Sequence, residues 1–269
     1  GVKNPQVFLG KRSFANCKYL QWNNKARQYI QNLPDGVFYG AEAITSVDLS
    51  LSSFSGIKSI GNEAFMNSGL EKITFGSNVK SIGDDAFRGC TGLTSAWRGQ
   101  GVPRRLTSVG AGAFRGTSIR SIYLGAPIQS IGDGCFAECA KLQAVNIASK
   151  ALTVIPSLAF SDCDNLKGFW VPDWVTNIGD SAFYNSTKLV QVNFGSSSAL
   201  RSVGNSAFRS CLSLKNVKLP FFGMETMPLV IGTEPKGSCV GRRSSPRSIE
   251  ERDTLPDSDI FVASFFPEP

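Results

Sequence analysis

The sequence predicts a repeat solenoid, mostly β, in which stacked coils carry a parallel sheet on one face and short helical or 3₁₀ turns opposite. Three observations lead to this fold class. The segment IGDDAFRGCTGL at 82–93 recurs along the chain, each copy holds a phenylalanine at the same place, and each ends in alternating apolar residues. Consecutive phenylalanines are 22–27 residues apart, a period typical of solenoids. They are Phe14, Phe38, Phe65, Phe87, Phe114, Phe136, Phe160, Phe183 and Phe208.

One unit is too short to cover its own apolar residues. An Ile, Val or Leu lies five residues before each phenylalanine, and an alternating pair such as Ile122 and Leu124 follows it. Stacking aligns equivalent residues in columns and adds one strand per coil to a parallel sheet, at a spacing of about 4.8 Å. We therefore expect a buried phenylalanine column to be the spine of the core, with Phe65, Phe87, Phe114, Phe136, Phe160, Phe183 and Phe208 as its regular part.

The segment around each phenylalanine is expected to turn on the outer side of the coil. The pattern D-x-A-F-x-x-C is too brief for a stable helix and fits a single helical or 3₁₀ turn. In most units a glycine such as Gly83 follows the leading apolar residue and suits a tight bend. The residue three positions after the phenylalanine is Cys, Ser, Thr or Ala, which indicates a slot that requires small size.

The chain is predicted to have three parts. Residues 1–220 form the solenoid, with about nine repeats of which the first two are degenerate, and residues 221–231 form a cap that seals the last coil. Residues 232–269 are polar and rich in Pro and Ser, and are expected to be an extended tail that binds a partner. The apolar anchor of this tail is Ile260, Phe261, Val262, Phe265 and Phe266.

These units are similar to the BspA-like leucine-rich repeats, also called Treponema-type, whose usual form is close to SIGxxAFxxCxxLxxIxIP. The resemblance covers about residues 9–220 and implies a leucine-rich-repeat stack. It implies no particular ligand, because a repeat scaffold does not fix what it binds. The family has no common catalytic residue. Related proteins are known at the cell surface and as adhesins of bacteria and parasitic protists, and they are abundant in other microbial eukaryotes.

The net charge of +7 is unevenly distributed. Residues 221–269 hold five Lys and Arg against eight Asp and Glu, a charge of −3, which leaves +10 on residues 1–220. A basic solenoid can indicate an acidic or nucleic-acid partner. The basic residues are scattered singly, however, with no dense run beyond Arg104 and Arg105, so a solvated surface is favoured and no nucleic acid is expected. No apolar run approaches the ~20 residues that span a membrane, and peripheral association stays open.

Seven cysteines raise the question of disulfides or a metal site. Ala, Ser and Thr replace cysteine in the small-residue slot, which favours free buried thiols there. A bridge between the cysteines of neighbouring coils, Cys139 and Cys163, stays an alternative. Cys135 and Cys139 make a poor zinc site without histidine, and Cys239, outside the repeats, is expected to be reactive. The slot cysteines are Cys17, Cys90, Cys139, Cys163 and Cys211.

Between the alternating core positions, each strand presents one outward residue, and three of eight are large aromatics. The column reads Asp48, Thr74, Trp97, Tyr123, Asn146, Trp170, Asn193 and Lys218. Trp and Tyr are enriched at interaction hot spots, and solenoids commonly bind through this surface. We therefore expect this face to bind protein, unless flanking loops cover the rings. The expected contacts are Trp97, Tyr123, Asn146, Trp170 and Asn193, with Trp174 as an extension.

The longest insertion, RGQGVPRRL at 98–106, is basic and contains Gly and Pro. Loops of this kind often contact partners, and a tolerated surface insertion is the alternative.

Catalysis, cofactors and metals are not expected. The chain contains no histidine, which excludes Ser-His-Asp and Cys-His arrangements. VGAGAF at 109–114 lacks the third glycine of a dinucleotide loop and lies in a repeat. Asp84 and Asp85 are adjacent rather than convergent. Asn185 begins the N-x-S/T sequence of a glycosylation acceptor.

The sequence favours a non-enzymatic protein-interaction module, a scaffold or accessory subunit whose partners are other protein subunits of a larger assembly. The alternative is a cell-surface or extracellular adhesin or recognition protein, which glycosylation of Asn185 or disulfides would favour. The chain starts almost inside a repeat and without Met, so we expect that a leader has been removed. That fits an organelle lumen, the periphery of an organellar complex, or the cell surface.

Overall fold

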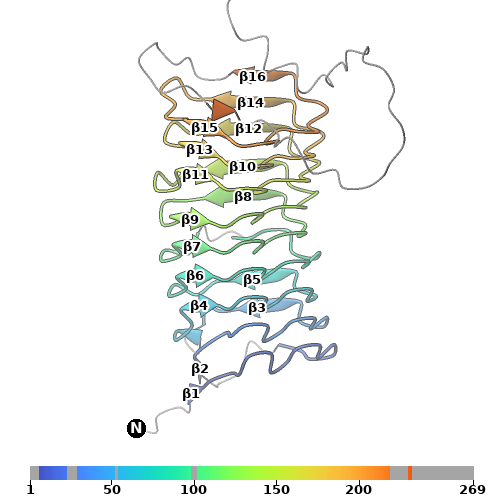
Figure 1. Cartoon of the computed structure of the whole chain (residues 1–269). Helices are drawn as coiled ribbons and strands as arrows, with labels where there is room; N and C mark the ends of the chain where they lie inside the picture. Colours follow the sequence, from blue (N-terminus) through green and yellow to red (C-terminus); the bar gives the residue numbers. More distant parts are fainter. Residues whose placement is uncertain (1–5, 23–28, 52–53, 98–101, 219–229, 232–269) are drawn as a thin grey trace, which may run out of the picture.

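The computed structural model describes residues 6–22, 29–51, 54–97, 102–218 and 230–231. The described residues wind into an elongated stack of coils in which every strand pairing is parallel (Figure 1). The predicted solenoid with a parallel sheet is therefore confirmed. The first coils pair through β1 (Gln6–Val7) and β2 (Tyr29–Ile30).

Two-residue strands form one ladder along the stack, because the leading apolar residue of each unit recurs at the same point of its coil. Ile82 lies between Ile60 and Val109 in this ladder. One sheet contains β4 (Ser59–Ile60), β6 (Ser81–Ile82), β7 (Ser108–Val109) and β9 (Ser130–Ile131). Another contains β11 (Val154–Ile155), β13 (Asn177–Ile178), β15 (Ser202–Val203) and β17 (Val230–Ile231).

Longer strands form the second ladder, and we call its outward surface the strand face. The alternating pattern buries one side of these strands, as with Ile122 and Leu124 in β8. The pairs are β3 (Ser46–Asp48) with β5 (Lys72–Thr74) and β8 (Ser121–Leu124) with β10 (Ala144–Ile147). A three-stranded sheet follows, with β12 (Gly168–Val171), β14 (Gln191–Phe194) and β16 (Asn216–Lys218).

The phenylalanine column is continuous, which confirms the predicted spine of the core. All nine rings stack, with centroids 5.2–5.8 Å apart from Phe14 to Phe208. Phe65, Phe87, Phe114, Phe136, Phe160 and Phe183 are fully buried, and Phe208 is partly buried against the same core. Spacing of this size lets each ring contact both neighbours at distances typical of aromatic pairs.

The predicted outer turns form, but they are hydrogen-bonded turns rather than helices. Residues such as Asp85 (φ 52°) and Gly89 (φ 70°) have the left-handed backbone conformation, which interrupts a helix. The amide of Phe87 instead donates to the carbonyl of Ala113 in the next coil, at 2.8 Å. The turns are therefore bonded from coil to coil, as the strands are.

The small-residue slot supplies a hydrogen-bond donor to the preceding coil. The Sγ of Cys90 lies 3.0 Å from the carbonyl oxygen of Phe65, and the Oγ of Ser186 lies 2.8 Å from that of Phe160. The same contact is made at 3.1–3.3 Å by Cys139, Cys163 and Cys211. Small size alone is thus an incomplete account of the slot, since these side chains also pair buried carbonyl groups.

Near each end of the stack, the structure includes a segment from outside the regular repeats. Phe54 lies in the Ser-rich segment 51–59, between two repeats, and its side chain is buried and contacts Trp22, with centroids 5.5 Å apart. From the predicted cap, Val230–Ile231 pair with Ser202–Val203 and extend a sheet. The rest of the cap and the tail lie outside the described residues.

Candidate interaction surface

Two large aromatic side chains stand exposed on the strand face. Tyr123 is 48 % exposed and Trp170 is 58 % exposed, and the exposed Asn146 lies between them along the stack. Tyr123 pairs in register with Asn146, and Trp170 pairs with Asn193, which is half-buried. Their backbones belong to four-residue parallel strands, so the backbone that carries these groups is ordered before any partner binds.

Trp97 lies in the core, so its predicted outward position is wrong. Its side chain is only 8 % exposed, and its ring centroid lies 5.6 Å from that of Phe75 and 5.7 Å from that of Phe114. In this unit the inward positions fall on Ala96 and Arg98. Alanine is too small to fill the space and a charged side chain is costly to bury, so the neighbouring Trp97 takes the core position.

Trp174 does not extend the exposed patch either. Its side chain is half-buried and packs against the hydrophobic core, and its Nε1 atom is buried. The predicted contact surface is therefore narrower than the sequence indicates, and its aromatic part consists of Tyr123 and Trp170.

The described part of the predicted insertion, residues 102–106, lies beside Trp97. Residues 98–101 lie outside the described part of the chain, while Val102 packs against the core and Leu106 is buried. A pocket of about 250 Å³ lies at this junction. Its lining includes Thr74, Phe75, Trp97, Val102 and Arg104.

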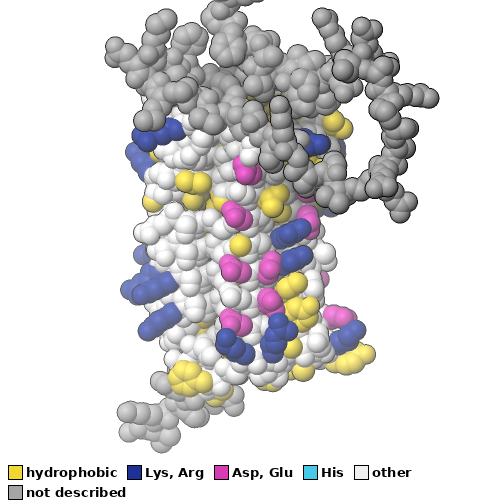
Figure 2. All heavy atoms as spheres, viewed as in Figure 1, with side chains coloured by type: hydrophobic (Ala, Val, Ile, Leu, Met, Phe, Trp, Pro, Cys, Tyr) yellow, Lys and Arg dark blue, Asp and Glu magenta, His cyan; other side chains and the backbone are white. Residues whose placement is uncertain are grey.

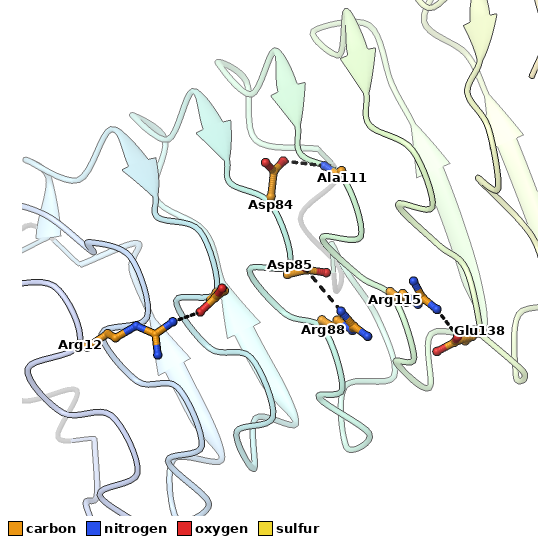
Figure 3. Close-up of polar contacts among 8 residues, drawn as sticks. Arg12, Asp84, Asp85, Arg88, Ala111, Arg115 and Glu138 are labelled. Atoms are coloured by element: carbon orange, nitrogen blue, oxygen red, sulfur yellow. Dashed lines mark hydrogen bonds and ion pairs between the residues drawn. The ribbon is translucent and has the colours of Figure 1, made fainter.

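The turns around the phenylalanines present a different surface, on which charged side chains pair with each other. Figure 2 shows acidic side chains following the long axis of the stack, with basic side chains beside them. The Arg115–Glu138 pair, at 2.5 Å, holds the pKa of Glu138 below its usual value because the guanidinium donates to the carboxylate. Ion pairs of the turns include Arg12–Glu63, Arg88–Asp85 and Arg115–Glu138 (Figure 3).

Carboxylate and amide side chains also bind the coils together at the turns. The Oδ1 of Asp84 accepts from the amide of Ala111 at 2.8 Å, as Figure 3 shows, and the amide of Asp84 donates to Asn62 at 2.9 Å. Asp84 is therefore a structural link between three coils. Many charged side chains of the turns form ion pairs or hydrogen bonds within the fold, whereas the Tyr123 and Trp170 rings of the strand face are exposed.

Four of the five slot cysteines are buried and stay protonated at neutral pH. Burial raises the pKa of Cys90 and of Cys139 to about 11 and that of Cys211 to about 12. The fifth, Cys17, is exposed, so the predicted burial is wrong for this first, degenerate unit, and Cys239 lies outside the described residues. The structure records Cys139 and Cys163 as free thiols. Among the described residues, no three His, Cys, Asp or Glu side chains converge as a metal site would require.

The side chains of the glycosylation acceptor sequence at Asn185 form hydrogen bonds within the fold. The Nδ2 of Asn185 donates to Asp162 at 2.8 Å, and Thr187 donates to Asp164 at 2.9 Å. Ser186 is fully buried. In the part of the chain that the structure describes, no helix has the length and apolar character to cross a membrane. The tail residues proposed as contacts, 260–266, lie outside that part.

Several solved structures resemble this chain. A leucine-rich repeat protein of T. pallidum is 21 % identical, with a TM-score of 0.49 and coverage of 79 % of each chain. A leucine-rich cell-surface protein of Faecalibacterium prausnitzii is 20 % identical, with a TM-score of 0.43 and coverage of 81 % of this chain and 70 % of the other. A leucine-rich repeat protein of Eubacterium ventriosum is 18 % identical, with a TM-score of 0.45 and coverage of 81 % and 79 %.

No curated protein sequence matches the chain. The family model described as "BspA type Leucine rich repeat region" matches it in six copies, over residues 4–96, 58–190 and 107–226. Repeats of this family are typically non-catalytic modules for protein–protein interaction or surface recognition. The matched residues include most of the stack and every phenylalanine of its column. The chain therefore belongs to the family of proteins built from BspA-type leucine-rich repeats.

Proposed function

We propose that this chain is a non-enzymatic scaffold or accessory subunit that docks on other protein subunits through its strand face. The observation that carries the proposal is the exposure of Tyr123 and Trp170, 48 % and 58 %, on a rigid part of the solenoid. Large aromatic side chains bury 150–250 Å² each, roughly, when a partner covers them, and they dominate the energetics of many interfaces.

The strands that carry these rings support the proposal. Tyr123 and Trp170 are held by parallel pairings that extend over four residues each. A backbone that is already ordered before association lowers the entropy cost of binding. The exposed amide of Asn146 lies between the rings and offers both a donor and an acceptor to a partner's backbone.

We also propose a second contact through the tail, where Ile260, Phe261, Val262, Phe265 and Phe266 give an otherwise polar segment its apolar anchor. Such a segment can add to a sheet edge or order on a partner. Its contribution is separable from that of the strand face, because replacing Phe261 and Phe265 by alanine changes only the tail.

The test is co-purification of the full chain from its native source under mild conditions, followed by identification of what migrates with it. The double variant Tyr123→Ala/Trp170→Ala is expected to lose co-migrating subunits, because hot-spot aromatics typically cost about 2 kcal/mol or more each when truncated. Both side chains are exposed, so the thermal unfolding midpoint should stay close to that of the original chain.

The matched control is Leu158→Ala/Tyr184→Ala, which removes two exposed apolar side chains, 42 % and 37 % exposed, from the turns. It is expected to retain the partners. Unchanged co-purification of the strand-face variant would contradict the proposal. Recovery of a chain that migrates alone and binds intact cells through the same face would favour the adhesin alternative over the subunit.

A further inference from the structure

The solenoid gathers basic residues that are far apart in the sequence into one row. Each of five successive coils contributes one exposed Lys or Arg at the edge where the chain enters the longer strands. We call this row the basic edge; it consists of Arg120, Lys141, Lys167, Lys188 and Lys215. We propose that the basic edge and the exposed aromatics of the strand face together bind an acidic polypeptide segment. This inference rests on the proposed function and names the chemistry of the partner.

The register of the coils places these residues side by side. Arg120 and Lys167 directly precede β8 and β12, and the amide of the next coil donates to each carbonyl at 2.8 Å. Lys141 and Lys188 lie three residues before β10 and β14. The Nζ of Lys188 reaches the Oδ1 of Asn165, the equivalent position of the coil between them, at 2.9 Å. From coil to coil, the cation therefore alternates between two neighbouring positions, one directly before the strand and one three residues before it.

No carboxylate among the described residues forms an ion pair with the basic edge. The equivalent positions that carry no cation are neutral, as with Asn165 and Val190, and Asp164 beside them accepts from Thr187. Cations of the turns, by contrast, pair with acidic side chains. Adjacent coils lie about 4.8 Å apart, within the Debye length of about 8 Å at physiological salt, so the like charges of the edge repel. An anionic partner would offset that repulsion.

The basic edge borders the two exposed rings, which gives the surface an aromatic centre and a cationic rim. Interfaces commonly combine these features, with aromatic anchors for affinity and charge complementarity for association rate and specificity. A polypeptide fits better than a nucleic acid, because a nucleic-acid groove stacks successive bases on successive aromatic side chains. Here Asn146 separates Tyr123 from Trp170, and an amide suits a peptide backbone. The outer coils of the edge lie about 20 Å apart, which roughly six extended residues span.

The probe is a fluorescein-labelled ten-residue peptide of eight Glu around a central Phe-Pro pair, and the control peptide carries Gln in place of Glu. Fluorescence anisotropy measures binding to the full chain. We expect the Glu peptide to bind at least about tenfold more tightly than the Gln peptide, and the difference to shrink as salt rises from about 0.1 M to about 1 M and the Debye length falls to about 3 Å.

The decisive variant is Lys141→Glu/Lys167→Glu/Lys188→Glu. Its control, Lys58→Glu/Lys80→Glu/Arg201→Glu, makes the same charge change at exposed positions just before β4, β6 and β15. The edge variant is expected to weaken Glu-peptide binding by at least about tenfold and the control variant by no more than about twofold. Equal effects of the two variants, or failure of the Glu peptide to bind, would overturn the inference. Tighter edge-dependent binding of a ten-nucleotide oligothymidine than of the peptide would overturn it in favour of nucleic acid.

Failure of this inference is distinguishable from failure of the proposed function. If Tyr123→Ala/Trp170→Ala abolishes co-purification of native subunits while the edge variant retains them, the strand face binds a partner that is not acidic. If the aromatic variant retains them, the proposed function itself is wrong. Both variants change exposed side chains, and a retained unfolding midpoint shows that each remains folded.

Discussion

At the scale of single residues, the small slot after each phenylalanine does two things. It admits a side chain small enough to lie between coils, and it gives the preceding coil a hydrogen-bond donor. The Sγ of Cys163 lies 3.3 Å from the carbonyl oxygen of Phe136, and in the described part of the chain no other donor reaches that oxygen. A buried carbonyl without a partner costs about 1–3 kcal/mol.

That cost predicts how the slot tolerates substitution. Cys163→Val, which has no donor, is expected to lower the free energy of unfolding by about 1–3 kcal/mol, and Cys163→Ser by less, because the hydroxyl still donates. Urea denaturation of the two variants measures the difference. Equal loss in both would mean that packing volume alone decides the slot.

The same thiols predict an alkaline limit to stability. The pKa of Cys90 rises from 9.0, the value of a solvent-exposed thiol, to about 11 in the fold, chiefly through burial. A pKa raised by folding contributes stability that is complete below the unfolded value and is lost as pH rises through the folded one. Stability should therefore fall between pH 9 and 11, by up to about 1.4 kcal/mol per pH unit for each such thiol.

The measurement is the free energy of unfolding in urea across that pH range. Its control replaces the four buried slot cysteines by serine, which removes the titration of these four thiols and leaves Cys135, Tyr and Lys unchanged. The control is expected to show a shallower decline. Identical curves would show that the thiols do not set the alkaline limit.

At the scale of elements, the turns hold the stack together with side chains as well as backbone. Asp84 accepts from the amide of Ala111 and itself donates to Asn62, so it connects three coils. This explains why Asp84 and Asp85 are adjacent without forming a catalytic pair: the first links coils, and the second, with φ of 52°, makes the turn.

Asp84→Ala is expected to lower the free energy of unfolding by about 1–2 kcal/mol, because the amide of Ala111 loses its acceptor. Asp84→Asn keeps an acceptor oxygen and should lose clearly less. Thermal unfolding followed by circular dichroism compares the two. An alanine variant as stable as the asparagine variant would show that water replaces the contact at no cost.

At the scale of the whole molecule, stability depends on contacts between neighbouring coils, as in other repeat proteins. Phe136 is fully buried and stacks on Phe114 and Phe160, whereas Phe14 is half-buried and stacks on Phe38. Phe136→Ala is expected to cost about 3–5 kcal/mol and Phe14→Ala less than half as much. Chemical denaturation of both variants checks the ratio. Equal costs would contradict a column in which each ring supports two neighbours.

The sequence predicts this column because a regular period leaves one arrangement that buries all the rings. It predicts the strand face less well. The outward position of Trp97 follows from the period, but the residues around it decide otherwise, since Ala96 leaves space that the tryptophan fills. The basic edge is invisible in the linear sequence because its members are separated by about one repeat each. Only the register of the coils, with Ser121 opposite Ala144 and Gly168 opposite Gln191, brings them together.

Site-specific photo-crosslinking tests the central claim, that the strand face is where this chain binds, most directly. Benzoylphenylalanine replaces Trp170 in one variant and Tyr184, on the turns, in another, and each is irradiated in the native extract. The strand-face position is expected to give a discrete protein adduct that the turn position does not. Adducts from position 184 alone, with none from position 170, would contradict the account.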